Sequence, residues 1–133
     1  MSSPALECFF YHSVLADGQD AGCVSDIIRT ARRFNAEHDI TGVLVFDGEH
    51  FCQYLEGPAG PLGQLIGRLM MDPRHQGFMP LIHQPLQSPR RYAGWSMAFA
   101  LLDDSAVLAP LLERDADTAL GYLEEIQCKL DMA

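Results

Sequence analysis

The chain has 133 residues, of which 48% are hydrophobic and 20% are charged, and its formal net charge is −9. This composition is typical of one globular domain with a single core, and it excludes an intrinsically disordered chain. The excess of acids argues against non-specific binding to nucleic acid or to an anionic membrane, and no apolar run is long enough to span a bilayer.

Cysteine usage and charge distribution add two expectations. The four cysteines form no C-x-x-C pair, and the N-terminus carries no signal-peptide pattern, so we expect free thiols and a cytoplasmic protein. Seven of the nine basic residues are arginines between Arg29 and Arg91, whereas eight acids and two bases follow from Asp103 onward. The middle of the chain could therefore hold a small anion, although solvated helix faces explain the same arginines.

Hydrophobic periodicity and turn residues predict the elements in chain order. A strand is expected over 6–12 and a helix over 24–38, and two strands then flank the tight-turn pair Asp47-Gly48. A helix follows over 61–71, begun by Pro61 and stopped by Asp72-Pro73. The remaining predictions are strands over 78–83 and 95–102 and helices over 105–112 and 116–130. Pro80 places the strand over 78–83 near a sheet edge.

This order predicts an α+β protein with the ferredoxin-like βαββαββ pattern. We expect an antiparallel sheet with two helices on one face and the two C-terminal helices on the other. Residues 1–102 are predicted to form the main domain and residues 103–133 a helical extension. In that extension, Ala116, Leu120, Leu123, Gln127 and Leu130 recur at the spacing of a short coiled-coil seam, and a helix that caps the sheet explains the pattern equally well.

Three polar residues are predicted to converge in the apolar layer between the sheet and the first two helices. Gln53 shares a strand face with Phe51, Tyr11 lies on the first strand, and Asn35 continues the i, i+4 row of Ile27. Each residue by itself could be an ordinary half-buried side chain. Together they need several hydrogen-bond partners, which a planar heteroaromatic ligand would supply.

These residues lie within a series of motifs that resembles the BLUF family, flavin-binding sensors of blue light. The motifs are "YHS" at 11–13, "FNAEHDITGVLVF" at 34–46, "FCQYLEG" at 51–57, "DPRH" at 72–75 and "WSM" at 95–97. The resemblance spans about residues 6–99 on a matching order of elements. Phe34 departs from the pattern, because several relatives carry a polar residue there, and this puts one extra hydrogen bond to the flavin in doubt.

The resemblance implies a role for each matching position. It implies that Tyr11 donates an electron and a proton through Gln53, whose amide then donates a new hydrogen bond to the flavin C4 carbonyl. The result would be a reversible, red-shifted signalling state that Trp95 and Met97 pass to the C-terminal helices, to an oligomer or to a partner protein. The implied flavin-binding residues are Tyr11, Ile27, Arg32, Asn35, Gln53, Arg68, Leu69, Asp72 and His75.

The flavin is expected to be FAD, with FMN or riboflavin also possible. The resemblance further implies a sensor that is not an enzyme, that forms at least a dimer and that acts on a separate partner protein. A ferredoxin-like interaction module without flavin remains the alternative. An enzyme or metal site is a third hypothesis, based on Arg74 beside His75 and on His50 with Cys52, but two ligands do not make a zinc site.

Overall fold

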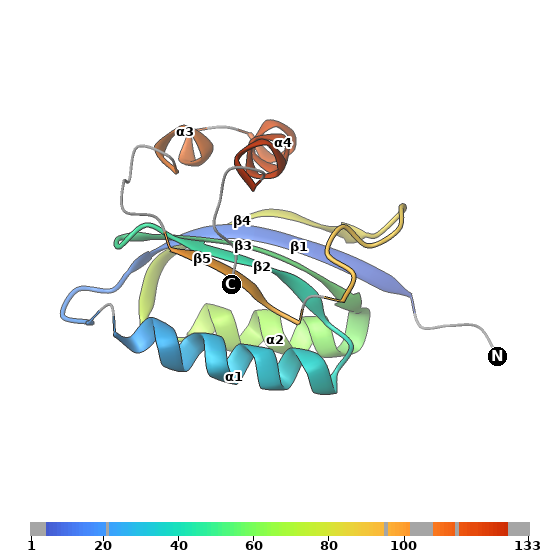
Figure 1. Ribbon diagram of the computed structural model, residues 1–133, viewed down its shortest axis with the longest axis horizontal. Helices are drawn as coiled ribbons and strands as arrows, with labels where there is room; N and C mark the ends of the chain where they lie inside the picture. The colour runs from blue at the N-terminus through green and yellow to red at the C-terminus, as the bar shows by residue number, and fades with distance from the viewer. Residues whose placement is uncertain (1–4, 21, 95, 102–107, 114, 128–133) are drawn as a thin grey trace.

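The computed structural model describes residues 5–20, 22–94, 96–101, 108–113 and 115–127 of the 133-residue chain. Five strands and four helices occur in these residues (Figure 1). In chain order they are β1 (Leu6–Leu15), α1 (Cys23–Glu37), β2 (Thr41–Phe46), β3 (His50–Pro58), α2 (Ala59–Met71), β4 (His75–Pro85), β5 (Ala98–Leu101), α3 (Ala109–Leu112) and α4 (Ala116–Gln127).

The strands form one sheet in the order β4-β1-β3-β2-β5. Its first four strands are antiparallel and have the ferredoxin-like arrangement, so the predicted α+β class is confirmed. The expectation of a wholly antiparallel sheet is wrong for the last pair, because β5 runs parallel to β2. The crossover segment, residues 86–97, explains this. It runs from the start of β1 to the start of β2, so β5 and β2 begin at the same end of the sheet.

The predicted elements all occur, with shifted ends where tertiary contacts decide the boundary. The first strand continues to Leu15 because it pairs with a neighbour on each side. The fourth strand begins at His75 and occupies one sheet edge, as Pro80 predicted. The fifth strand begins at Ala98, later than predicted, because side chains of α1 bind the backbone oxygens of Ser96 and Met97. Positions 95 and 102 of the predicted strand lie outside the described residues. Residues 105–107 and 128–130 of the predicted C-terminal helices lie outside the described residues.

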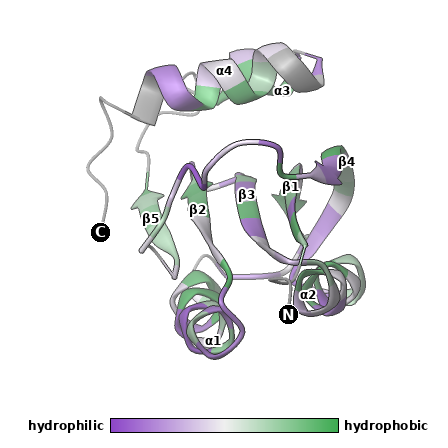
Figure 2. Cartoon of the chain, turned by 90° about the vertical axis from the view of Figure 1, so that its right-hand side faces the viewer, coloured by the Kyte–Doolittle hydropathy of each residue, from purple (hydrophilic) through white to green (hydrophobic). Residues whose placement is uncertain are grey.

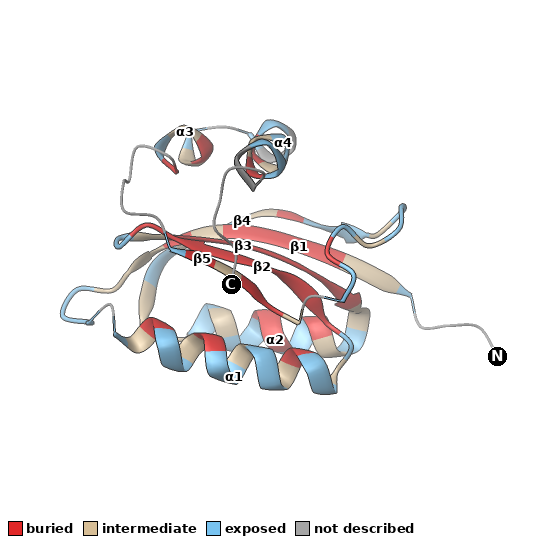
Figure 3. Ribbon diagram, viewed as in Figure 1, coloured by how far each residue is buried: buried red, intermediate tan, exposed pale blue. Residues whose placement is uncertain are grey.

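Helices cover both faces of the sheet, and each face has its own core (Figures 1 and 2). One core lies between the sheet and the pair α1 and α2, and it includes Phe9 and Leu62. The other core includes Phe10 and Tyr54 of the sheet together with Leu111 of α3. Adjacent residues such as Phe9 and Phe10 point to opposite faces because side chains alternate along a strand. Figure 3 shows the buried central strands between the two helical layers.

One face of α4 packs into the second core of the same chain. Ala119 and Leu123 are fully buried against the sheet, and Leu120 packs beside them. Leu123 and Leu120 were two of the predicted seam positions, so in the monomer this face of α4 caps the sheet. The side chains of the other three seam positions lie outside the described residues.

Candidate functional site

The site is built around a cross-strand pair on the helix-covered face. Tyr11 of β1 lies directly opposite Gln53 of β3, and the Tyr11 hydroxyl donates a hydrogen bond of 2.5 Å to Gln53 Oε1. Both residues are buried, with 3% and 4% of their surface exposed. Burial raises the pKa of Tyr11 far above its ordinary value, because the phenolate would lose its hydration. Tyr11 is therefore a neutral phenol whose proton points at the amide.

The other end of the Gln53 amide faces Met97, the residue just before β5. Gln53 Nε2 donates a weak hydrogen bond of 3.7 Å to Met97 Sδ, and Met97 is itself 3% exposed. Met97 thus points inward, whereas Trp95 lies outside the described residues. The amide joins the phenol to Met97 through its acceptor and its donor at once, which a carboxylate or an apolar side chain could not do.

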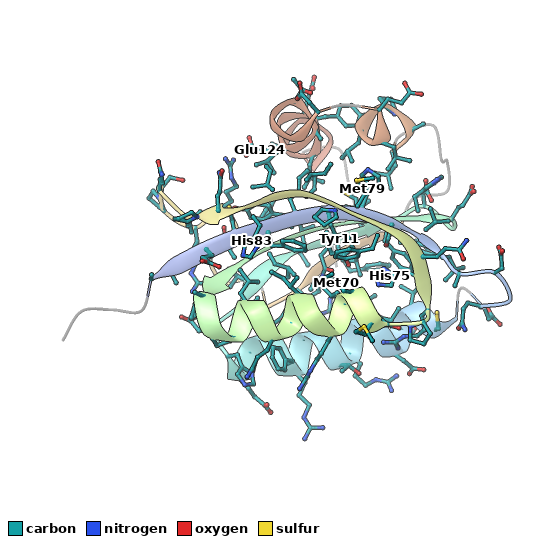
Figure 4. All side chains as sticks on the ribbon, turned by 180° about the vertical axis from the view of Figure 1, so that it is seen from behind. Tyr11, Met70, His75, Met79, His83 and Glu124 are labelled. Carbon is teal, nitrogen blue, oxygen red and sulfur yellow. The ribbon has the colours of Figure 1, made fainter. Side chains whose placement is uncertain are left out.

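A cleft between α1 and α2 opens onto this pair. It comprises two spaces of about 300 and 560 Å³, both lined by Ile27 of α1, Leu69 of α2, Gln53 and the charged residues Asp72 and Arg74. Figure 4 shows Tyr11 and His75 on the face of the sheet that α2 covers. Apolar walls on two helices with an amide between them suit a flat ring system with polar edges.

Asn35 provides a test of whether a flavin fits this layer. It is completely buried near the end of α1, where its Nδ2 donates a 2.7 Å hydrogen bond to the Ser96 carbonyl oxygen. Its Oδ1 is buried without a partner among the described residues. An unsatisfied buried acceptor destabilises a fold by about 1–3 kcal/mol, so this oxygen needs a donor. The imide N–H of a flavin is a donor of the required kind, and the site fits the cofactor.

The mouth of the cleft is organised by charged and hydrogen-bonded groups. Asp72 accepts hydrogen bonds of 2.6–3.1 Å from the Arg74 guanidinium, and these bonds lower the pKa of the Asp72 carboxyl. His75 Nε2 lies 2.5 Å from the carbonyl oxygen of Leu69, so it carries the proton, and Nδ1 lies 2.7 Å from Ser13 Oγ. The ring of His75 is thereby fixed between β1 and the end of α2.

The two remaining predicted arginines lie in different places. Arg68 lines the larger space, with its guanidinium 4.7 Å from the centre of the Phe34 ring. Phe34, the departure from the BLUF pattern, therefore serves as a stacking surface for Arg68. Arg32 lines neither space, and its Nε donates a 3.0 Å hydrogen bond to the carbonyl oxygen of Met97. Arg32 thus contacts the residue just before β5 and does not line the cleft.

Sequence reasoning missed several residues that complete the site. Arg74 was counted as a cation but not as a wall of the cleft, although its i, i+2 spacing from Asp72 was visible. Ser13 was quoted only within a motif, and no sequence signal indicated its bond to His75. Ser96 contributes only a backbone oxygen, which no side-chain pattern can reveal.

The geometry agrees with a comparison against known protein families. The family model for BLUF, described as sensors of blue light using FAD, matches residues 6–98. The chain belongs to the BLUF family. It is therefore a flavin-binding sensor of blue light, and the cleft beside Tyr11 and Gln53 is the candidate site for the cofactor.

The curated relatives that match this chain are longer proteins. The blue light- and temperature-regulated antirepressor of Escherichia coli (strain K12) is 32% identical over 77 residues, which is 58% of this chain and 19% of the relative. The photoactivated adenylate cyclase subunit beta of Euglena longa is 35% identical over 88 residues, which is 66% of this chain and 10% of the relative. The chain thus spans a fifth or less of these relatives' lengths.

Solved structures agree with the fold. The dark-state structure of the BLUF protein BlrB has a TM-score of 0.78 and 28% identity, with 92% of this chain and 94% of that chain covered. The photo-activated state of BlsA has a TM-score of 0.79 over 90% of this chain and 93% of that chain. Its 21% identity shows a shared fold alone.

The metal-site hypothesis finds no support in the described part of the chain. Nowhere in those residues do three or more His, Cys, Asp or Glu side chains gather to hold a metal ion, so His50 and Cys52 remain two potential ligands without a third. Among the same residues, no helix has the length and apolar character needed to cross a bilayer.

Proposed function

We propose that this BLUF protein signals by rearranging the hydrogen bonds of Gln53, and that Met97 carries the change to strand five. The observation that supports this is the continuous path from the Tyr11 hydroxyl through the Gln53 amide to Met97 Sδ. All three residues are at most 4% exposed, so these contacts lie away from bulk water.

Bound flavin supplies the absorption of blue light and a strongly oxidising excited state. Tyr11 suits the role of electron donor because burial keeps its phenol neutral and directs its proton at Gln53 Oε1. Gln53 can accept that proton at Oε1 and pass it on, since an amide offers both a donor and an acceptor. After this relay the amide can remain rotated or tautomerised. The 3.7 Å contact of Nε2 with sulfur is the weaker of its two bonds and breaks first.

Loss of that contact frees the Met97 side chain while its carbonyl oxygen remains bound to Arg32. The backbone next to Met97 leads directly into β5, which packs in both cores. We infer that residues 1–102 sense light and that residues 103–133 carry the output. The output then reaches a second copy of the chain or a separate cytoplasmic partner without catalysis by this protein.

The test is an absorption spectrum of the flavin-bound protein in the dark and after blue light. We expect a small red shift that reverses in the dark, and we expect Gln53→Leu to retain flavin and lose the shift. Gln64→Leu, which replaces an exposed amide on α2, is the matched control and should respond like the wild type. A normal red shift in Gln53→Leu would disprove the mechanism.

The output is tested separately by light-scattering mass. A chain that ends at residue 102 should have a lower oligomeric state than the full chain if the C-terminal helices form the contact between copies. An oligomer of unchanged size would place that contact on another surface of the protein.

A further inference from the structure

Glu56 is a completely buried carboxylate that the flavin site does not use. It lies on β3 three residues after Gln53, and the odd spacing turns it toward the opposite face of the sheet. Its Oε1 accepts a 2.9 Å hydrogen bond from the backbone N–H of Arg91, and its Oε2 accepts one of 2.8 Å from the N–H of Tyr92. Thr41 Oγ1 donates a further bond of 3.1 Å to Oε2. Both oxygens therefore hold the crossover segment against β2 and β3.

Arg90 reinforces the same attachment from outside. Its Nη1 donates to Thr41 Oγ1 at 3.0 Å and to the backbone oxygen of Glu56 at 3.2 Å. Its Nη2 donates to the carbonyl oxygen and to the carboxylate of Asp39, at 2.9 and 3.0 Å. The side chain of Arg90 is only 14% exposed, so its bonds to Thr41 and to the Glu56 backbone form in a partly desolvated place where they are stronger than on an open surface. Its bonds to Asp39 are exposed and contribute less. Three consecutive residues, 90 to 92, are fixed.

The crossover segment is attached to the light-sensing residues at its other end. Ser96 accepts the hydrogen bond from Asn35, and Met97 contacts Arg32 and Gln53. Only three residues separate Tyr92 from Ser96, so the two attachments are at most about 14 Å apart along the chain. The position of Met97 against Gln53 is consequently coupled to the position of Tyr92, and through it to the Glu56 carboxylate.

The same attachment also touches the C-terminal helices. The guanidinium of Arg91 forms an ion pair with Glu124 of α4. The centre of the buried Tyr92 ring lies 5.6 Å from the centre of the Tyr54 ring. Figure 4 shows Glu124 on the far side of the sheet from Tyr11 and α2. One short stretch of chain therefore contacts the flavin face at Met97 and α4 at Arg91.

We propose that Glu56 is a positioning residue for the light response, which holds the crossover segment so that Met97 re-forms its contact with Gln53 in the dark. This inference rests on the proposed function of Gln53 and Met97. When Met97 moves away from Gln53, it pulls on the crossover segment, which Glu56 keeps in place. The intact hydrogen bonds of Glu56 then favour the return of Met97 to its contact with Gln53. Weakening the attachment removes part of this preference for the dark arrangement, so the lit state lasts longer.

Glu56→Gln tests the proposal, because glutamine keeps one acceptor and turns an NH2 group toward backbone N–H donors. We expect unchanged flavin content, an unchanged red shift and dark recovery that is roughly tenfold slower, the size of effect expected from one charge-assisted hydrogen bond. Glu7→Gln on β1, which alters a partly exposed carboxylate that binds His83, should recover at the wild-type rate. Thr41→Val keeps the shape but removes one donor to Glu56 and one acceptor of Arg90, while both backbone bonds of Glu56 remain. It should also slow recovery, and it replaces Glu56→Gln in the test if that variant does not fold.

Variants made in a Met97→Ala protein distinguish a positioning role of Glu56 from general destabilisation of the fold. In Met97→Ala, the contact that Glu56 is proposed to restore no longer exists, so adding Glu56→Gln or Thr41→Val should change recovery no further. An equal slowing in the Met97→Ala background, an equal slowing by Glu7→Gln, or wild-type recovery in Glu56→Gln would overturn the proposal. A wild-type protein without any light-induced red shift would instead disprove the proposed function of Gln53.

Discussion

Replacement of Asn35 by leucine should weaken flavin binding without weakening the flavin-free protein. The two side chains have nearly the same shape, so the variant leaves no cavity in the layer under α1. In the flavin-free protein the change removes the 2.7 Å bond to Ser96, a loss of about 1 kcal/mol. It also removes the buried Oδ1 that lacks a partner, a gain of about 1–3 kcal/mol.

The balance for the flavin-free protein lies between no change and a stabilisation of about 2 kcal/mol. The flavin-bound protein behaves differently, because the ligand's N–H would then be buried without an acceptor. This costs about 1–3 kcal/mol and raises the dissociation constant about 5- to 150-fold. The variant therefore separates binding from folding, which a cavity-forming substitution could not do.

Two measurements check this prediction. Titration of the flavin-free protein with FAD, followed by the quenching of flavin fluorescence, gives the dissociation constant. Urea unfolding without flavin gives the stability. Gln64→Leu, at the exposed amide on α2, should change neither quantity by more than a small amount. The reasoning is refuted if Asn35→Leu binds FAD as tightly as the wild type, or if the flavin-free variant is less stable by more than about 1 kcal/mol.

Two further predictions concern the second core. Burial raises the pKa of Tyr54, and it raises the pKa of Tyr92 to about 12. Because unfolded tyrosines ionise near pH 10, the folded state loses stability as the pH rises above about 10, and Tyr54→Phe should reduce that slope by about 1.4 kcal/mol per pH unit in urea unfolding. Leu123→Ala empties a fully buried site on α4 and should destabilise the protein by about 2–5 kcal/mol. Its flavin affinity should remain at the wild-type value, because α4 lies across the sheet from the cleft; a large loss of affinity would contradict the separation of the two cores.

The sequence by itself determined the order of elements and the chemistry of the central pair. Alternating apolar residues, the Asp47-Gly48 turn and the helical spacing of Ile27 and Asn35 are local signals, and local signals are readable from one chain. Strand parity put Gln53 on one face with Phe51, and Tyr11 on one face with Phe9, because neighbouring residues must point to opposite sides of a sheet. The structure shows the two residues directly opposite each other.

Only the tertiary structure decided the contacts that join residues distant in the chain. The parallel pairing of β5 depends on where the crossover segment runs, and no local pattern encodes that path. The same holds for Arg32, which binds the backbone of Met97 instead of the cleft, and for Glu56, whose partners are backbone N–H groups of Arg91 and Tyr92. Backbone donors and acceptors are identical in every non-proline residue, so a sequence cannot reveal which of them a side chain will bind.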